Sequence, residues 1–175
     1  EKRYLEYHIL TLKSEIKQAK ELGAKQLIFH VFTKRYSRKE LNILRVLLNY
    51  GKRNGVELVL ENNRRSTVSS FKQIIKEFPK LRINLDIGHL NNQLGLKAIA
   101  DTDSFVNIIK DRICYMHVHG NHGIKDEHIS LNKTTLDYKK VFKLLDLKKI
   151  QKFIIEVHDK KHIKPTYNLL CKLLK

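Results

Sequence analysis

Five acidic or histidine residues in this sequence each end a short apolar run, and together they have the chemistry of a metal site. They are His30, Glu61, Asp86, His117 and Glu156. Imidazole nitrogens and carboxylate oxygens are ligands that divalent cations bind in proteins. The sequence therefore indicates a metal centre if the fold brings these five residues together.

The apolar runs have the spacing of βα units. Successive end residues lie 31, 25, 31 and 39 positions apart, and a βα unit takes roughly 30 residues or more. In a parallel barrel the C-terminal ends of all strands meet at one rim, where the active site lies. We therefore predict five strands whose end residues converge: Gln26–His30, Val56–Glu61, Leu81–Asp86, Ile113–His117 and Phe153–Glu156.

Amphipathic helices are predicted before the first strand and after each strand. The first helix ends at Gly23, because glycine commonly follows a helix C-terminus. The second is capped by Ser37, with Glu40 in the capping-box position. The third is predicted to open at Ser66 and to stop at Pro79.

The remaining helices follow the same pattern. A cap at Asp103 or Ser104 is predicted for the fourth, a cap at Asp137 for the fifth, and a start at about Pro165 for the last. Helices that alternate with continuous apolar strands are typical of a parallel sheet covered by helices.

The predicted fold class is α/β: a (β/α)8 TIM barrel, here an N-terminally truncated part with about five parallel strands. A complete barrel has eight strands and about 250 residues, so this chain of 175 residues falls short by several units. The chain starts at Glu1 and its only methionine is Met116, so three further βα units are expected before residue 1. An open sheet is the alternative, but neither Gly-rich phosphate-binding motif occurs.

Domain organisation follows from the same count. No linker or composition break divides the sequence, so residues 1–175 are expected to form one domain. The strand at Gln26–Val31 is expected to be an open edge of the sheet. Exposed edges promote association, so a homo-oligomer is one expected state.

The composition favours a cytoplasmic globular protein. Apolar residues make up 42% of the chain, and no run approaches the ~20 apolar residues of a membrane span. No membrane partner is therefore expected, and the charged start does not resemble a signal peptide. Cys114 and Cys171 lack C-x-x-C spacing and are expected to be reduced thiols.

The formal net charge of +17 admits three interpretations. The basic residues are spread over the predicted helix faces, which favours a solvated surface. A phosphorylated small substrate and a nucleic acid such as DNA are the second and third interpretations, in that order.

Two further motifs place histidines and acids beside the predicted strand ends. In Asp86-Ile-Gly-His89, Gly88 is expected to permit a tight turn that brings His89 to the rim. His117 and His119 are two residues apart and share one face of a strand. The loop that follows carries an acid–imidazole pair, Asp126 and His128, and Glu61 is followed by two asparagines.

Taken together, these motifs resemble the xylose isomerase-like TIM barrels. This group contains sugar-phosphate isomerases and epimerases and, in AP endonuclease family 2, endonuclease IV. The resemblance extends over residues 26–157. The matching segments are Leu60-Glu61-Asn62, Asp86-Ile-Gly-His89, His117-Val-His-Gly-Asn121, Asp126-Glu-His-Ile-Ser-Leu131 and Ile154-Ile-Glu156.

The resemblance implies one divalent metal ion (Mn²⁺, Mg²⁺, Co²⁺ or Zn²⁺). Its implied ligands are Glu61, Asp86, His117 and Glu156. Four more residues match further zinc ligands of endonuclease IV, or residues that face the substrate in the isomerases: His30, His89, Asp126 and His128.

Two departures from the family pattern stand out. Gly120 occupies a position where the family commonly has aspartate, and Asn132-Lys-Thr-Thr replaces a Gly-x-Gly turn.

The leading functional interpretation is a metal-dependent isomerase or epimerase that acts on a small sugar or sugar phosphate. In this mechanism Glu61 and Glu156 are the acid/base pair, and the reaction passes through an enediolate. One alternative is an endonuclease IV-like zinc phosphodiesterase that acts on abasic DNA, which the positive charge favours. The other is a barrel remnant without activity, which Gly120 and the missing strands favour.

Overall fold

A curved sheet of five parallel strands forms the centre of the protein. The computed structural model describes residues 2–30 and 35–174, and the side chains of residues 2–8 lie outside this description. The strand order is β1-β2-β3-β4-β5, and every neighbouring pair is parallel. The strands are β1 (Gln26–His30), β2 (Glu57–Glu61), β3 (Ile83–Asp86), β4 (Ile113–Val118) and β5 (Lys152–Ile155).

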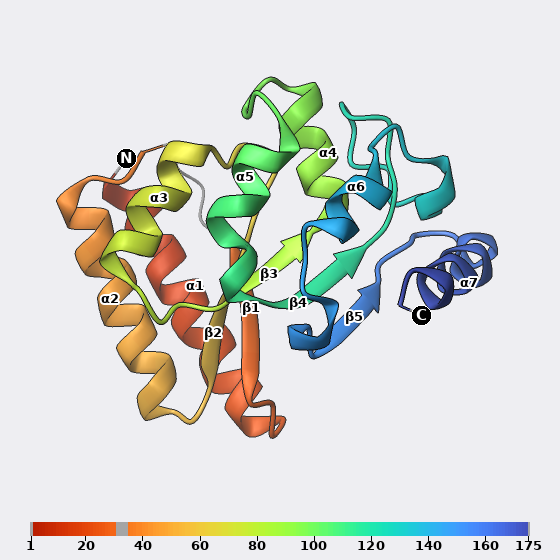
Figure 1. The fold of residues 1–175 in the computed structure, drawn as a ribbon. Helices are drawn as coiled ribbons and strands as arrows, with labels where there is room; N and C mark the ends of the chain where they lie inside the picture. Colours follow the sequence, from red (N-terminus) through yellow and green to blue (C-terminus); the bar gives the residue numbers. More distant parts are fainter. Residues whose placement is uncertain (1, 31–34, 175) are drawn as a thin grey trace.

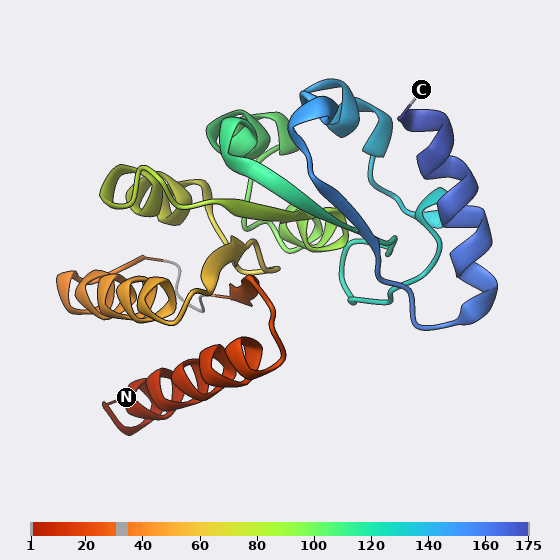
Figure 2. The same ribbon diagram turned by 90° about the horizontal axis from the view of Figure 1, so that it is seen from below.

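Helices lie along the outside of this curved sheet, as Figures 1 and 2 show. They are α1 (Lys2–Glu21), α2 (Arg38–Arg53), α3 (Val68–Glu77), α5 (Thr102–Ile109), α6 (Tyr138–Lys143) and α7 (Ile163–Leu173). A further helix, α4 (Ile87–Gly95), follows β3 without a gap. The prediction of an incomplete α/β barrel with β1 at one edge is confirmed; Val31 lies outside the described residues.

Alternation of side chains along each strand separates the core from the site. Phe29, Leu60 and Leu85 point toward the helices and are buried in the main core. Their neighbours His30 and Glu61 point to the concave face. Each large apolar side chain that is buried in this way stabilises the fold by about 1.5–3 kcal/mol. Packing against the helices thus fixes the strands, and the strands fix the positions of the polar residues on the concave face.

Two of the predicted helix caps are confirmed. Ser37 and Glu40 form a reciprocal capping box at the start of α2. The Asp137 carboxylate accepts a hydrogen bond from the Lys140 backbone N–H at the start of α6.

Two other predicted caps are wrong by one to three residues. The cap of α3 is Thr67 and not Ser66, because the Ser66 hydroxyl accepts a hydrogen bond from the backbone of Asn63 within the preceding loop. The cap of α5 is Asp101 and not Asp103 or Ser104. Its carboxylate accepts a hydrogen bond from the Ser104 backbone N–H at 2.7 Å.

The start of the last helix also differs from the prediction. The last helix starts at Ile163, two residues before the predicted Pro165.

No helix within residues 2–30 and 35–174 has the length and apolar character needed to cross a membrane. Cys114 and Cys171 are both free thiols.

His89 reaches the rim as predicted, 3.5 Å from Glu61, but through the start of α4, directly after Asp86, and not through a tight turn at Gly88. The Asp86 carboxylate caps this helix by accepting a hydrogen bond from the His89 backbone N–H at 2.7 Å. Gly88 is needed for a different reason. A Cβ atom there would lie 1.9 Å from the ring of His119.

Candidate metal centre

Three carboxylates surround one ring nitrogen of His117 at the C-terminal ends of the strands. Nδ1 of His117 lies 2.9 Å from Oε2 of Glu61, 3.3 Å from Oε2 of Glu156 and 3.7 Å from Oδ2 of Asp86. The four side chains lie together at one end of the sheet, as their strand-end positions predict. Their role as metal ligands stays a prediction.

The register of the strands produces this convergence. His30 pairs with Glu61 across β1 and β2, and Asp86 pairs with His117 across β3 and β4. Residues in register on neighbouring parallel strands project to the same face. Glu156 lies one residue beyond the end of β5, and its side chain is 44% exposed.

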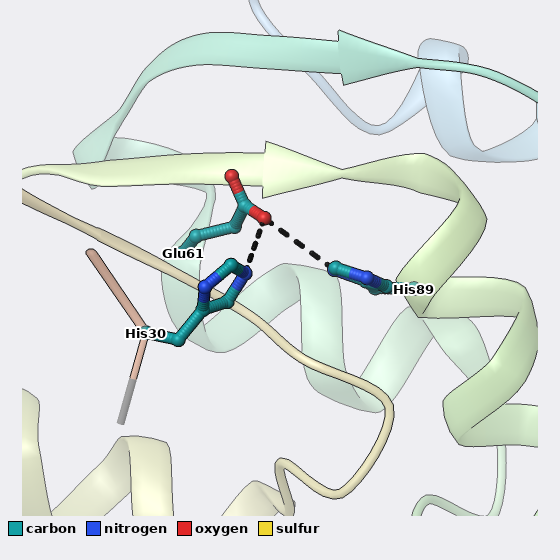
Figure 3. A group of neighbouring side chains, drawn as sticks. All are labelled: His30, Glu61 and His89. Carbon is teal, nitrogen blue, oxygen red and sulfur yellow. Dashed lines mark hydrogen bonds and ion pairs between the residues drawn. The ribbon is translucent and has the colours of Figure 1, made fainter. Parts of the chain in front are cut away.

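Glu61 is buried, and each of its carboxylate oxygens contacts neighbouring side chains. Figure 3 shows the contacts of one oxygen, with His30 and His89. Its Oε1 atom lies 2.6 Å from Nε2 of His30 and 3.5 Å from Nδ1 of His89. The side-chain amide of Asn84 donates a hydrogen bond to its Oε2 atom. Sequence analysis missed Asn84, although its position two residues before Asp86 on the same strand places it on the same face.

Asn62 fixes the end of β3, where Asp86 lies. Its side-chain oxygen accepts a hydrogen bond from the Asp86 backbone N–H at 2.8 Å, and its side-chain NH₂ donates to the Asp86 carbonyl at 3.0 Å. This pair of bonds imitates strand pairing through a side chain. The backbone of Asp86, whose side chain is fully buried, is therefore fixed at the end of β3.

A second cluster lies beside the first, at Asp126. Nε2 of His89 and Nε2 of His128 lie 3.0 Å and 3.3 Å from the same Oδ2 atom of Asp126. Nδ1 of His89 donates to the Asn62 carbonyl at 2.9 Å, and Nδ1 of His128 donates to the Glu156 carbonyl at 2.6 Å. Since a carbonyl only accepts, both Nδ1 atoms carry hydrogen and both Nε2 atoms are left to face the carboxylate.

The structure thus divides the predicted second group in a way that the sequence did not show. His89, Asp126 and His128 gather at one carboxylate oxygen, whereas His30 lies against Glu61. His89 connects the two clusters, because its ring approaches both Asp126 and Glu61.

His119 contacts members of both clusters, Asp86 and His128. It is fully buried, its Nε2 atom lies 3.1 Å from Oδ1 of Asp86, and its ring stacks on that of His128 at 3.9 Å. His122, by contrast, is exposed and pairs with Glu127 on the outer side of the loop.

The electrostatics of the centre favour ionised acids beside charged imidazoles. Burial raises the pKa of Glu61 and of Asp86, but the contacts of both with His117 outweigh burial and hold each pKa well below its usual range. Burial lowers the pKa of His117, and the carboxylates of Asp86, Glu156 and Glu61 raise it to about 12. Asp126 and Glu61 likewise outweigh burial and raise the pKa of His89 to about 11.

This donor set fits a divalent cation. Nδ1 of His117 is buried among the three carboxylates and makes no hydrogen bond of good geometry. Ligand atoms of Glu61, Asp86 and His117 lie within 4.8 Å of one another, and so do those of His30, Glu61 and His89. In both groups carboxylate oxygens and imidazole nitrogens lie close enough together to share one cation.

Three buried asparagines connect the loop of the second cluster to α4. The side-chain NH₂ of Asn121 donates to the Gly88 carbonyl at 2.8 Å, and Asn91 donates to both oxygens of Asn121. Asn92 donates to the Lys125 carbonyl at 3.1 Å. Because α4 carries His89 and the loop carries Asp126, this network fixes the two halves of the cluster relative to each other.

The departure from the family pattern at Gly120 has a steric reason. Gly120 pairs with Ile129 through two backbone hydrogen bonds of 2.8 and 3.0 Å, which close the loop. A Cβ atom at Gly120 would lie 2.6 Å from the Ser130 carbonyl oxygen. An aspartate therefore cannot replace this glycine without a shift of the loop.

The close approach of α4 to His119 leads to a prediction about stability. Gly88→Ala is expected to lower the free energy of unfolding by about 1–3 kcal/mol, because the methyl group overlaps a ring that has no free space to move into. Urea denaturation checks the value. The double variant Gly88→Ala/His119→Ala is expected to recover part of the loss; if it adds the two single losses instead, the overlap is not the cause.

The chain belongs to the xylose isomerase-like TIM barrel family, whose sequence profile matches residues 1–173. It is 31% identical over 164 residues to the uncharacterized protein MJ1614 of Methanocaldococcus jannaschii, and the match covers 85% of this chain. The chain spans only 61% of the length of that relative.

Solved structures share the fold. A D-tagatose 3-epimerase-like protein aligns with a TM-score of 0.79 at 20% identity, over 99% of this chain and 71% of the other. The IOLI protein with a binding zinc atom aligns with a TM-score of 0.66 at 15% identity, over 95% and 68%. At these identities the alignments define the fold, and the function has to be argued from the site.

Proposed function

We propose that this chain forms the metal-binding part of a sugar or sugar-phosphate isomerase or epimerase. The observation that carries the proposal is the approach of Glu61 and Glu156, from different strands, to the same nitrogen of His117. Two carboxylates beside one cation site are what the movement of a proton next to a carbonyl group requires.

The two glutamates differ in exposure, because Glu61 is buried whereas the side chain of Glu156 is 44% exposed. Contacts with His117 lower the pKa of Glu156, and His117 and His30 oppose the effect of burial on the pKa of Glu61. Both are therefore carboxylates at neutral pH and able to accept a proton. One glutamate removes the proton from the carbon beside the carbonyl group and becomes a carboxylic acid. In an isomerase the same acid would return this proton to the neighbouring carbon; in an epimerase the other glutamate, after it takes a proton from water, would deliver it to the opposite face of the reacting carbon.

Other residues of the centre fix the positions of Glu61 and Glu156. Asn84 and His30 fix the Glu61 carboxylate, and His128 bonds the backbone of Glu156. A divalent cation bound by Glu61, Asp86, His117 and Glu156 would stabilise the negative charge that develops on the substrate oxygens.

Unpaired basic side chains favour a phosphorylated substrate. Arg64 and Arg65 follow Glu61 by three and four residues, on the loop after β2, and both are exposed. Neither has an ion-pair partner among the described residues. A guanidinium group binds phosphate in a bidentate manner, so these residues are suited to the phosphate of a small sugar.

Deuterium exchange tests the proposal directly. The protein is incubated in D₂O with Mn²⁺ and with D-tagatose or its phosphates, and loss of the proton beside the carbonyl group is followed by NMR. We expect metal-dependent exchange, faster with a phosphate. Absence of exchange with every sugar, in a protein that binds Mn²⁺, contradicts the proposal.

A second candidate function rests on the second cluster. His89, Asp126 and His128 offer two imidazoles and a carboxylate beside the main centre, which suits a second zinc ion and phosphodiester hydrolysis. Nicking of a duplex that contains one abasic site, measured with and without Zn²⁺, separates this function from the first. Failure of both assays favours a barrel without activity.

Metal binding is expected to strengthen as pH rises. The raised pKa of His117, about 12, means that its ring carries a proton at neutral pH in the metal-free protein. A cation must displace that proton, so the apparent affinity is expected to rise about tenfold per pH unit for each proton released. Calorimetric titration with Mn²⁺ at pH 6, 7 and 8 measures this slope. Equal affinity at the three pH values would mean that metal binding displaces no proton from a ligand.

A further inference from the structure

His128 adopts an unusual backbone conformation that other groups must maintain. Its φ angle is +48°, in the left-handed region that side chains other than glycine seldom occupy. The residue nevertheless directs its Nε2 atom to Asp126, at 3.3 Å. Contacts around His128 must therefore favour this arrangement over the alternatives.

Two of these contacts come from the backbone that follows β5. Nδ1 of His128 donates to the Glu156 carbonyl at 2.6 Å, and the backbone N–H of His158 donates to the His128 carbonyl at 3.1 Å. The first bond fixes the tautomer, and both together connect the loop to the end of β5.

The third contact is a stack of three imidazole rings. The His128 ring lies between those of His119 and His158, at centroid distances of 3.9 and 4.2 Å and interplanar angles of 6° and 16°. His119 is fully buried and is held by its contact with Asp86, whereas His158 is exposed. The side of the His128 ring that faces His158 is therefore the side on which the ring would be free to swing.

We propose that His158 is a positioning residue that closes this side and keeps Nε2 of His128 directed at Asp126. It acts through the flat face of its ring and not through a ring nitrogen. The inference builds on the second cluster of the proposed function. It applies equally whether that cluster binds a cation or a substrate hydroxyl group.

Two variants of His158 distinguish a flat ring from a ligating nitrogen. His158→Ala removes the ring, and His158→Phe keeps a flat ring without nitrogen. His122→Ala is the control, because it removes an exposed histidine that lies on the loop of His128 but does not belong to the stack.

Long-range ¹H–¹⁵N NMR spectra of the histidine rings give a readout in the metal-free protein. We expect a single Nδ1–H signal of His128, from its hydrogen bond to the Glu156 carbonyl, in the unmodified protein, in His158→Phe and in His122→Ala. In His158→Ala we expect this Nδ1–H signal to broaden by exchange. Titration with Zn²⁺, followed at the His128 ring signals, should show about 10- to 100-fold weaker binding for His158→Ala alone.

Two results overturn the proposal. One is an unchanged Nδ1–H signal of His128 in His158→Ala; the other is a His158→Phe protein that behaves like His158→Ala, which would give the role to a ring nitrogen. If Zn²⁺ does not bind even to the unmodified protein, the proposed second cation site fails. The Nδ1–H signal of His128 still decides the role of His158 in that case.

Discussion

His117→Ala is expected to lower the affinity for Mn²⁺ or Zn²⁺ by about 100-fold or more. Its Nδ1 atom is the point at which the carboxylates of Glu61, Asp86 and Glu156 meet. Loss of an outer partner of a metal ligand already costs about 10- to 100-fold in affinity, and removal of a ligand is expected to cost more. Calorimetry at neutral pH measures the change.

The same substitution separates a metal site from an ion-pair network. Without the imidazole, three acids face one another with less compensating charge, so the metal-free variant is also expected to be less stable. The fold should persist, because the neighbouring Met116 and Val118 point into the main core and are not altered. His122→Ala is the control; if it weakens binding as much as His117→Ala, the carboxylates around His117 are structural.

The strand ends were predictable from the sequence because the length and spacing of the apolar runs mark them. Apolar runs of the length of a strand end at His30, Glu61 and Asp86, and the carboxyl ends of parallel strands share one rim. The sequence therefore predicted which of these side chains meet. It did not show that His30 would lie against Glu61 and away from Asp126, because that depends on the curvature of the sheet and on rotamers.

Loop-borne features were less predictable, because they arise from contacts between distant segments. Nothing local to Gly88 shows that a buried ring from residue 119 lies against it. The missed helix α4 begins directly after Asp86, a residue that acts both as the helix cap and as a member of the centre. Asn84 was missed because an amide inside a strand has no distinctive pattern, although its face was predictable.

The clearest errors at helix caps have a common origin. Several hydroxyl and carboxylate residues lie within a few positions of each start, and any of them can accept a backbone hydrogen bond. Asp101 prevails over Asp103 because its carboxylate bonds both the backbone and the hydroxyl of Ser104. Local sequence thus places a cap to within a turn, and the loop geometry selects the residue.

Glu156→Gln is expected to lower the rate of substrate proton exchange by about 100- to 10,000-fold while metal binding changes much less. The amide oxygen of glutamine still offers a neutral ligand atom, but it cannot accept a proton at neutral pH. Glu156 is the more exposed of the two glutamates, so its substitution is also expected to leave the buried contacts of Glu61 intact.

Deuterium incorporation at saturating Mn²⁺ measures the effect of Glu156→Gln, and calorimetry measures its metal affinity. Glu127→Gln is the matched control, because Glu127 lies on the neighbouring loop and pairs with His122 outside the centre. A Glu156→Gln protein that binds metal and exchanges the substrate proton at the unmodified rate would remove Glu156 from the acid/base pair. Proton transfer would then have to be assigned to Glu61 and a second group. His89 is the candidate for this group, because it contacts the Glu61 carboxylate.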